Sequence, residues 1–377
     1  MNICIDAHLS ENRLTGIGRY LNGLIPELIR QGSDHLWTLL LADDLDVNHP
    51  LSRINAKHVR KIPVAFRGPT LRQHLLTHRI VNRIKADIYH HPHFDLPLGI
   101  QCPCVTTIHD LKYLRHPQFF PQKSQLKTVY MNWAFKQSLR RSVQVIAISD
   151  FTRNDIKAFW AGAAEKTTVI HHGLDHPSWH GDDKKILPAL PLKNPYILCV
   201  AEQRPHKNIT TLIDSFSKLI QQKQWEGHLV ISGKSYSDYT EPEDRVRELG
   251  LGDHIHFTGY VTEHQMSSLY NKASLFVLPS LYEGFGFPIL EAMQAGVPVI
   301  AANTTAIPEI MGQGGLLFNA EDADQLSKLM KNLLNDSGRR KKLIEAGQNR
   351  AAQFTWARAA ASTLKCYQKA IGSHKSK

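Results

Sequence analysis

The segment from Ser274 to Ala302 constrains the fold more than any other part of the chain. Its first six residues form an apolar run that predicts a buried strand, and a glycine-bearing turn leads from there into a short helix, expected over Pro288 to Ala295. Pro288 suits the first helical position, where its missing N–H costs nothing, and Gly296 suits the position after the last turn. A second apolar run follows the helix. The pattern therefore predicts a βαβ unit of a parallel sheet.

Two carboxylates accompany the start of this helix: Glu283 in the loop before it, and Glu291, expected in its first turn. Ligands of open α/β sheets bind beside such loops, and the free N–H groups of a helix start suit phosphate. A carboxylate repels phosphate but accepts hydrogen bonds from two vicinal hydroxyl groups. The combination indicates a sugar nucleotide. The alternative is that Glu291 complements the helix dipole and Glu283 is a solvated loop residue.

Strands and amphipathic helices alternate along the rest of the chain, as is typical of parallel α/β folds. We expect two such domains, 1–175 and 195–355, joined by a linker at 176–194. A last helix within 356–377 is expected to return to the first domain and to end in a disordered tail from Gly372. The other predicted strands are Ile3–Ala7, Trp37–Leu41, Ile88–His90, Cys104–Ile108, Val145–Ile148, Thr168–His171, Tyr196–Ala201, His228–Ser232 and His254–Phe257.

The stretch from Glu283 to Glu291, an E-x7-E with an internal GFGFP, resembles the donor-site motif of retaining GT-B glycosyltransferases of family four. The resemblance implies an α/β chain of two Rossmann-like domains that face each other across a cleft, the first for the acceptor and the second for a nucleotide sugar. It implies that Glu283 binds sugar hydroxyls and that Glu291 binds the ribose diol. The donor-binding residues between them are Gly284, Phe285, Gly286, Phe287, Pro288, Ile289 and Leu290.

Cationic residues follow another predicted strand end in the segment Val200–Asn208. Arg204, Lys207 and the helix start behind them are suited to phosphate. The segment resembles the G-x-x-x-P-R-K-N element that neutralises the donor pyrophosphate, and Lys207 matches its lysine. His206 stands where the family has arginine, and Ala201-Glu202 where it has glycine and a polar or basic neighbour. Arg204 is a candidate to supply the missing charge.

Further positions are carried over from the same resemblance. Gly16 and Gly18 match a glycine loop that approaches the donor and acceptor; a dinucleotide fingerprint is excluded there because Leu21 replaces its third glycine. His109, at a predicted strand end, matches a histidine that contacts the transferred sugar, with a structural role as the alternative. The segment expected to pack on the nucleobase is Gly259, Tyr260 and Val261.

No metal or cofactor is expected beyond the nucleotide sugar itself. The cluster His90-His91-Pro92-His93 is a candidate for metal binding, but Pro92 and the consecutive spacing argue against one shared tetrahedral site. The resemblance also implies metal-independent transfer. Five cysteines without a C-x-x-C pair indicate reduced thiols and a cytoplasmic protein.

Positive charge is concentrated in the first half, where residues 1–180 hold 22 Lys and Arg against 14 Asp and Glu. Acidic residues are absent from 47–86 and from 111–149, and the second stretch interleaves bases with aromatic residues. This pattern favours an anionic membrane surface or a lipid phosphate. No nucleic-acid-binding motif accompanies it, so nucleic acid is not an expected partner. The alternative is a solvated basic face.

The resemblance thus implies a retaining glycosyltransferase, and the basic first half predicts that it is peripheral at the inner face of the cytoplasmic membrane. GDP-mannose is the first candidate donor, and the acceptor is a glycan or lipid-linked precursor of bacterial surface polysaccharide or lipopolysaccharide. Arg204, Lys207 and the helix start would stabilise the leaving pyrophosphate. Two alternatives stay open: a nucleotide-sugar epimerase or hydrolase, which should add carboxylates near His109 beyond Asp110, and a non-catalytic carbohydrate- or membrane-binding protein.

Overall fold

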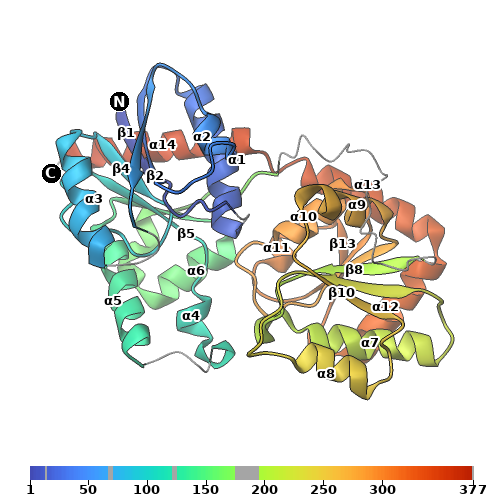
Figure 1. Cartoon of the computed structure of the whole chain (residues 1–377). Helices are drawn as coiled ribbons and strands as arrows, with labels where there is room; N and C mark the ends of the chain where they lie inside the picture. The colour runs from blue at the N-terminus through green and yellow to red at the C-terminus, as the bar shows by residue number, and fades with distance from the viewer. Residues whose placement is uncertain (13–14, 67–70, 121–124, 175–194, 376–377) are drawn as a thin grey trace. The chain divides into compact units, whose positions relative to one another are not determined.

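The computed structural model describes residues 1–12, 15–66, 71–120, 125–174 and 195–375. The chain divides into two compact units, one formed by Met1–Asp175 with Phe354–Lys377 and the other by His176–Gln353 (Figure 1). Each unit is built on one parallel sheet with helices, so the predicted α/β class is confirmed. The expected linker 176–194 lies outside the described residues, and a cleft between the two units stays a prediction.

The first unit holds a seven-stranded sheet in the order β3-β2-β1-β4-β5-β6-β7, with all its strand pairs parallel. Its elements are β1 (Asn2–Asp6), α1 (Gly16–Gln31), β2 (Leu36–Ala42), α2 (Pro50–Arg53), β3 (Val59–Val64), α3 (Leu71–Arg83), β4 (Ile88–His91), β5 (Cys104–Ile108), α4 (Lys112–Arg115), α5 (Gln125–Arg141), β6 (Gln144–Ala147), α6 (Asp150–Phe159), β7 (Thr167–Val169) and α14 (Trp356–Lys375), with 3₁₀ turns at Pro117–Phe119 and Ala161–Lys166.

The second unit holds a six-stranded parallel sheet in the order β10-β9-β8-β11-β12-β13. Its elements are β8 (Tyr196–Val200), a 3₁₀ turn (Pro205–Lys207), α7 (Ile209–Gln221), β9 (His228–Ser232), α8 (Glu241–Glu248), β10 (Ile255–Gly259), α9 (Glu263–Lys272), β11 (Leu275–Leu278), α10 (Phe287–Gln294), β12 (Val299–Ala302), α11 (Ile307–Met311), β13 (Gly315–Phe318), α12 (Ala323–Asn335) and α13 (Ser337–Ala351).

Burial of both sheet faces explains why most strands were visible in the sequence as apolar runs. Every residue of β4, β5, β11 and β12 is buried. The two strands that the sequence analysis missed, β3 and β13, lie at sheet edges. Strand β3 carries Arg60, Lys61 and Pro63, residues that an edge strand tolerates because one side pairs with no neighbour.

The last helix, α14, belongs to the first unit and packs against α1. The close approach depends on Gly23 of α1, where a Cβ atom would lie 2.0 Å from the ring of Trp356. Gly173 is similarly placed, since its Cβ would lie 2.1 Å from the backbone nitrogen of Trp356. The prediction of a disordered tail from Gly372 is wrong as far as Lys375, because α14 continues to that residue.

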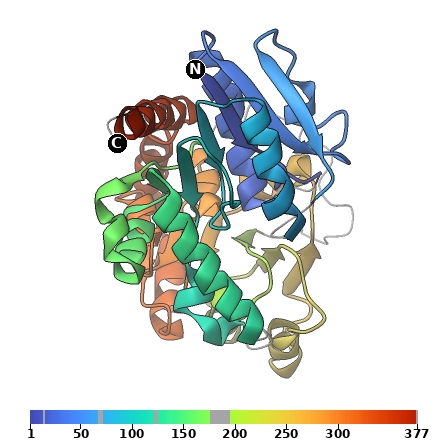
Figure 2. The ribbon, with the colours of Figure 1, turned by 90° about the vertical axis from the view of Figure 1, so that its left-hand side faces the viewer.

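Helices α3 and α5 share the face of the first unit that is turned toward the viewer in Figure 2.

Among the described residues, no helix combines the length and the apolar composition that a membrane crossing requires.

Candidate active site

The second sheet reverses its strand order between β8 and β11, which are neighbours in the sheet but not in sequence. The loops after these two strands diverge there, and such a switch point is where open α/β sheets bind ligands. A backbone hydrogen bond of 2.8 Å from the N–H of Leu281 to the carbonyl of His206 joins the two loops. Lys207 and Glu283, both predicted as site residues, belong to these loops.

Lys207 and Glu283 form an ion pair at this switch point. The Nζ atom of Lys207 lies 2.7 Å from Oε1 of Glu283, and each side chain is 14% exposed. Ser280 donates its hydroxyl to the same carboxylate oxygen at 2.7 Å, and the N–H of Glu283 donates to Oγ1 of Thr305 at 3.0 Å. Two side chains therefore hold the carboxylate oxygen Oε1, and a third holds the backbone of Glu283. Both residues were predicted from the sequence, but their contact was not.

Asn208 holds the lysine-bearing loop in place, and the sequence analysis did not select it. Its backbone is left-handed, with φ of 53°, directly before α7. The side-chain amide donates to the carbonyl oxygens of Pro279 at 3.1 Å and Ala320 at 2.8 Å. Asparagine is one of the few residues that tolerate this backbone conformation, which is the signal that was available.

Arg204 lies in a separate cluster rather than with Lys207. Its guanidinium stacks on the ring of Tyr236, 3.4 Å from the centroid, and Nη1 donates to both carboxylate oxygens of Asp238 at 3.1 and 3.2 Å. Tyr236 in turn donates to Glu202 at 2.9 Å. His206 is buried, with Nε2 3.9 Å from the other oxygen of Glu202. Glu202 and His206, which depart from the family pattern, thus belong to the same cluster as Arg204.

Glu291 is buried inside the unit, 1% exposed, where its Oε2 accepts a 2.8 Å hydrogen bond from the hydroxyl of Tyr270 in α9. The prediction that Glu291 lies in the first turn is wrong, because Gly286, with φ of 95°, caps α10 and the first turn contains no acidic residue. Tyr270 was not selected from the sequence. Its place in α9, before β11, gave no local signal.

The other predicted donor residues divide into two groups. Phe285, Ile289, Leu290 and Val261 are buried core residues, whereas Gly284, Phe287 and Pro288 are partly exposed and Tyr260 is exposed. Gly259 ends β10 with φ of 65°, and its carbonyl accepts a 3.0 Å hydrogen bond from Gly233. A Cβ on Gly233 would lie 2.0 Å from the carbonyl oxygen of Ala201. The close packing of these strand-end turns therefore requires glycine there.

In the first unit, Gly16 and Gly18 open α1. Thr15 caps the helix by accepting the N–H of Gly18 at 3.0 Å. A Cβ on Gly16 would meet nothing within 4 Å, so its side is open, whereas one on Gly18 would lie 3.1 Å from the Thr15 hydroxyl. Gly16 is thus the one of the two that leaves backbone accessible.

His109 follows β5 and is held by the loop after β4. Its Nε2 lies 3.0 Å from the carbonyl oxygen of Pro92, and its ring packs against those of Tyr20 and His172. Burial, with a smaller contribution from His93, lowers the pKa of His109 to about 4. The imidazole is therefore neutral near pH 7, with Nε2–H donated to Pro92 and Nδ1 available as an acceptor.

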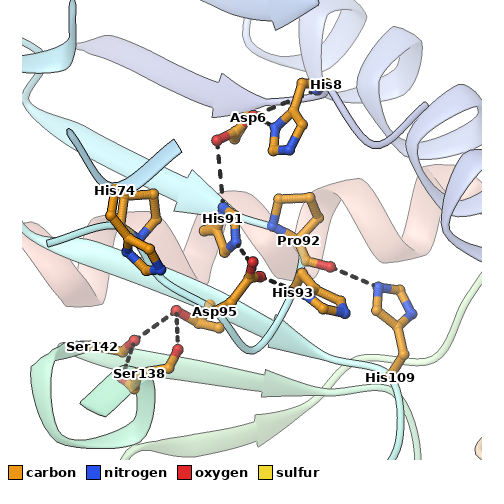
Figure 3. A network of polar contacts seen from close by, with 12 residues as sticks. Asp6, His8, His74, His91, Pro92, His93, Asp95, His109, Ser138 and Ser142 are labelled. Carbon is orange, nitrogen blue, oxygen red and sulfur yellow. Dashed lines mark hydrogen bonds and ion pairs between the residues drawn. The ribbon is translucent and has the colours of Figure 1, made fainter. Parts of the chain in front are cut away.

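A network of histidines and aspartates lies beside this loop (Figure 3). Asp6 is bonded to Nδ1 of His8 and to the hydroxyl of Tyr89 at 2.5 Å, and it lies 3.5 Å from Nδ1 of His91. Asp95 is bonded to His91 Nε2 at 3.0 Å and to His93 Nδ1. Burial opposes a charge on His91, but Asp6 and Asp95 raise its pKa to about 9.

His90 does not join this network, although it is adjacent in sequence. Its ring nitrogens bond to the hydroxyls of Tyr367 at 2.6 Å and Thr107 at 2.8 Å. In the sequence the histidines form one run, and Asp6 and Asp95 were not predicted as their partners. A carboxylate inside the apolar strand β1 was the available signal for Asp6.

Comparisons with known proteins agree with this architecture. The model described as "Glycosyltransferase Family 4" matches residues 14–177, and the one described as "Glycosyl transferases group 1" matches residues 182–350. O-antigen chain mannosyltransferase B of Escherichia coli is 31% identical over 375 residues, which cover 94% of this chain and 96% of that protein. Serotype-specific mannosyltransferase WbdA of Escherichia coli is 29% identical over 297 residues, covering 75% of this chain but only 35% of that longer protein.

The fold is also found among solved structures. Anabaena Alr3699/HepE in complex with UDP-glucose superposes with a TM-score of 0.71 at 20% identity, with 100% of both chains covered. This likeness, together with the two Rossmann-like sheets, confirms the predicted GT-B fold. The full-length match at 31% identity and the two family models establish that the chain belongs to the family-four, group 1 glycosyltransferases.

Proposed function

We propose that this enzyme transfers mannose, with retention of configuration, from GDP-mannose to a glycan or lipid-linked acceptor in lipopolysaccharide O-antigen synthesis. The names of both Escherichia coli relatives support the sugar, and the name of the first supports the O-antigen chain. The observation that carries the assignment of the site is the Lys207–Glu283 pair at the switch point of the second sheet.

Lys207 is proposed to stabilise the charge that develops on the leaving pyrophosphate, since a fixed cation is most effective where negative charge grows in the transition state. The N–H groups at the start of α10, after Gly286, would add to this stabilisation. Arg204 would also stabilise the pyrophosphate once its guanidinium had broken its ion pair with Asp238. A pyrophosphate is already a good leaving group, and its departing oxygen would take the proton of the acceptor hydroxyl, so no protein base and no metal are assigned to the step.

Glu283 is proposed to accept hydrogen bonds from the hydroxyls of the transferred sugar, and Glu291 from the ribose diol. The carboxylate of Glu291 would then accept hydrogen bonds from both the ribose and the hydroxyl of Tyr270. Its two oxygens carry enough lone pairs for both. In the first unit, His109 is proposed to accept a sugar hydroxyl at Nδ1, because Nε2 is occupied by Pro92. Gly16 and Gly18 are proposed to let backbone approach the donor.

A membrane-facing role is proposed for a surface of the first unit formed by α3 and α5. Leu126, Val129 and Trp133 of α5 are 82%, 67% and 42% exposed and recur at helical spacing on one side. Lys127 and Lys136 lie on the same helix, which has no acidic residue. Apolar side chains among bases suit an anionic lipid surface. The enzyme would then act at the cytoplasmic face of the membrane.

A groove beside this surface suits the lipid part of an acceptor. It has a volume of about 380 Å³ and lies between β3 and α3, with Ile62, Phe66 and Ile80 among its apolar lining residues. Arg60, Arg79 and Arg83 border it, and all three are exposed. The combination fits an apolar chain that carries a phosphate.

Incubation of the purified enzyme with GDP-mannose and a lipid-linked O-antigen precursor tests the proposal, with NMR assignment of the anomeric configuration in the product. An α-mannosyl product from the α-configured donor supports it. Inverted product would contradict retention, and release of free mannose without transfer would favour the hydrolase alternative. UDP-glucose serves as the competing donor.

A further inference from the structure

The loop after β4 brings together three groups that the transferase reaction does not use: the imidazoles of His91 and His93 and the carboxylate of Asp95. His91 Nε2 lies 3.0 Å from Oδ1 of Asp95, and His93 Nδ1 contacts the same oxygen. One ligand atom from each of the three lies within 4.8 Å of those of the other two. Figure 3 shows both imidazoles directed at Asp95.

We propose that His91, His93 and Asp95 bind a divalent transition-metal ion, for which Zn²⁺ is the best match. Two imidazole nitrogens and one carboxylate oxygen form a common zinc ligand set. Ligand atoms around a tetrahedral zinc ion lie about 3.3 Å apart, as bond lengths of about 2.0–2.1 Å require. The 3.0 Å between His91 Nε2 and Asp95 Oδ1 is near this spacing, whereas His93, which is hydrogen-bonded directly to Asp95, would turn away from it to admit an ion.

The surroundings of His91 support this assignment. Metal-bound histidines usually donate their second ring N–H to a carboxylate or carbonyl, which fixes the ring. Asp6 occupies that position, with Oδ2 3.5 Å from Nδ1 of His91. The hydroxyl of Tyr89 donates to the same Asp6 oxygen at 2.5 Å, so the supporting carboxylate is itself fixed.

The buried negative charges beside the three ligands also favour a bound cation. Asp6 and Asp95 are both buried, with exposed fractions of 1% or less. These buried carboxylates require compensating positive charge, which the imidazole of His91 supplies through its contacts with both. A divalent ion in place of the Nε2 proton of His91 would supply the same compensation. His93 is the outermost ligand, with 19% of its side chain exposed, so a solvent molecule has room to complete the coordination from that side.

The proposed ion would be structural. Pro92 lies between the two histidine ligands, and its carbonyl oxygen accepts the Nε2–H of His109. Fixing both neighbours of Pro92 would therefore fix the acceptor that orients His109. The proposal does not rest on the transferase reaction, and no step of transfer is assigned to the ion.

The test uses chelator-treated full-length enzyme, titrated with ZnCl₂ and followed by elemental analysis and thermal unfolding. Wild type should bind about one zinc per chain and unfold at a higher temperature, whereas His93→Ala and Asp95→Asn should bind at least ~10-fold more weakly. His256→Ala is the matched control. It removes one partner of an imidazole pair in the second unit, where His256 Nε2 lies 3.0 Å from His228 Nδ1, and should leave zinc binding unchanged.

Because His93 is partly exposed, His93→Ala should unfold in chelator within a few degrees of wild type, which shows that it is folded. Wild type without stoichiometric zinc, or equal binding by His93→Ala and His256→Ala, would overturn the proposal. In the first case the cluster is a metal-free charge network.

Discussion

The ammonium group of Lys207 lies 2.7 Å from Oε1 of Glu283, so the cation proposed for the pyrophosphate and the carboxylate proposed for the sugar are in direct contact. A pyrophosphate would offer Lys207 a second anionic partner through a charge-assisted hydrogen bond. Glu283 would stay fixed by Ser280 and the Thr305 contact while its remaining lone pairs accept sugar hydroxyls. The pair thus links recognition of the two halves of the donor.

Replacing either partner should abolish most transfer while the fold is kept. Lys207→Ala and Glu283→Gln are each expected to lower kcat by about 10²–10³, the range for loss of one transition-state contact. Lys218→Ala is the control, since it removes an exposed Lys–Asp pair in the same unit. Wild-type rates in Lys207→Ala or Glu283→Gln, with circular dichroism unchanged, would refute the site.

Tyr270→Phe tests the buried support of Glu291. It removes the hydroxyl that donates to Oε2 at 2.8 Å and leaves the carboxylate short of one partner. A stability loss of about 1–3 kcal/mol is expected from denaturant unfolding. Nucleotide affinity measured by calorimetry should fall as well, because the carboxylate is then less well oriented. Unchanged nucleotide affinity would contradict the proposal that Glu291 binds the ribose.

Acid should destabilise the first unit through His90. Burial, with contributions from His91 and His109, lowers its pKa to about 3, below the ~6.5 of an unfolded histidine. As the pH falls below about 6.5, protons therefore bind the unfolded chain first, and stability is lost by about 1.4 kcal/mol per pH unit down to about pH 3.

His90→Gln keeps a donor and an acceptor for Tyr367 and Thr107 but cannot titrate. Between pH 6 and 4, the unfolding free energy of this variant should fall less steeply than that of wild type. The difference in slope should be about 1.4 kcal/mol per pH unit, the value for one proton. If the unfolding free energies of the variant and of wild type fell equally with pH, His90 would not be buried as a neutral imidazole.

Binding to anionic vesicles should depend on the exposed side of α5. Leu126→Ser with Trp133→Ser is expected to reduce sedimentation with phosphatidylglycerol vesicles about tenfold, because buried apolar area supplies part of the binding energy. Val47→Ser, at a position 80% exposed in the same unit, is the control. Equal loss in the control, or none in the double variant, would leave this surface as a solvated basic face.

The sequence predicted the parallel strands well because apolar runs buried on both faces are a local signal. Edge strands β3 and β13 lack that signal, since their residues are only partly covered. The length of α14 was underestimated because Gly372 suggested an end, whereas the helix tolerates it.

Motif spacing alone selected Lys207, Glu283 and Glu291, and their role as site residues stays a prediction. Contacts that depend on folding were not visible: Tyr270 reaches Glu291 from another helix, and Asp6 reaches His91 from another strand. The burial of Glu291 was also missed, because the left-handed cap at Gly286 shifts the helix start.

The most direct test of the donor site is thermal unfolding of wild type and Lys207→Ala with GDP, UDP, ADP and their sugar conjugates, in chelator. The account predicts that GDP and GDP-mannose raise the unfolding temperature of wild type by several degrees at saturating concentration, and that Lys207→Ala loses most of this shift. A shift that requires added magnesium would contradict the metal-independent assignment. No shift with any nucleotide, or an equal shift in the variant, would contradict the donor site itself.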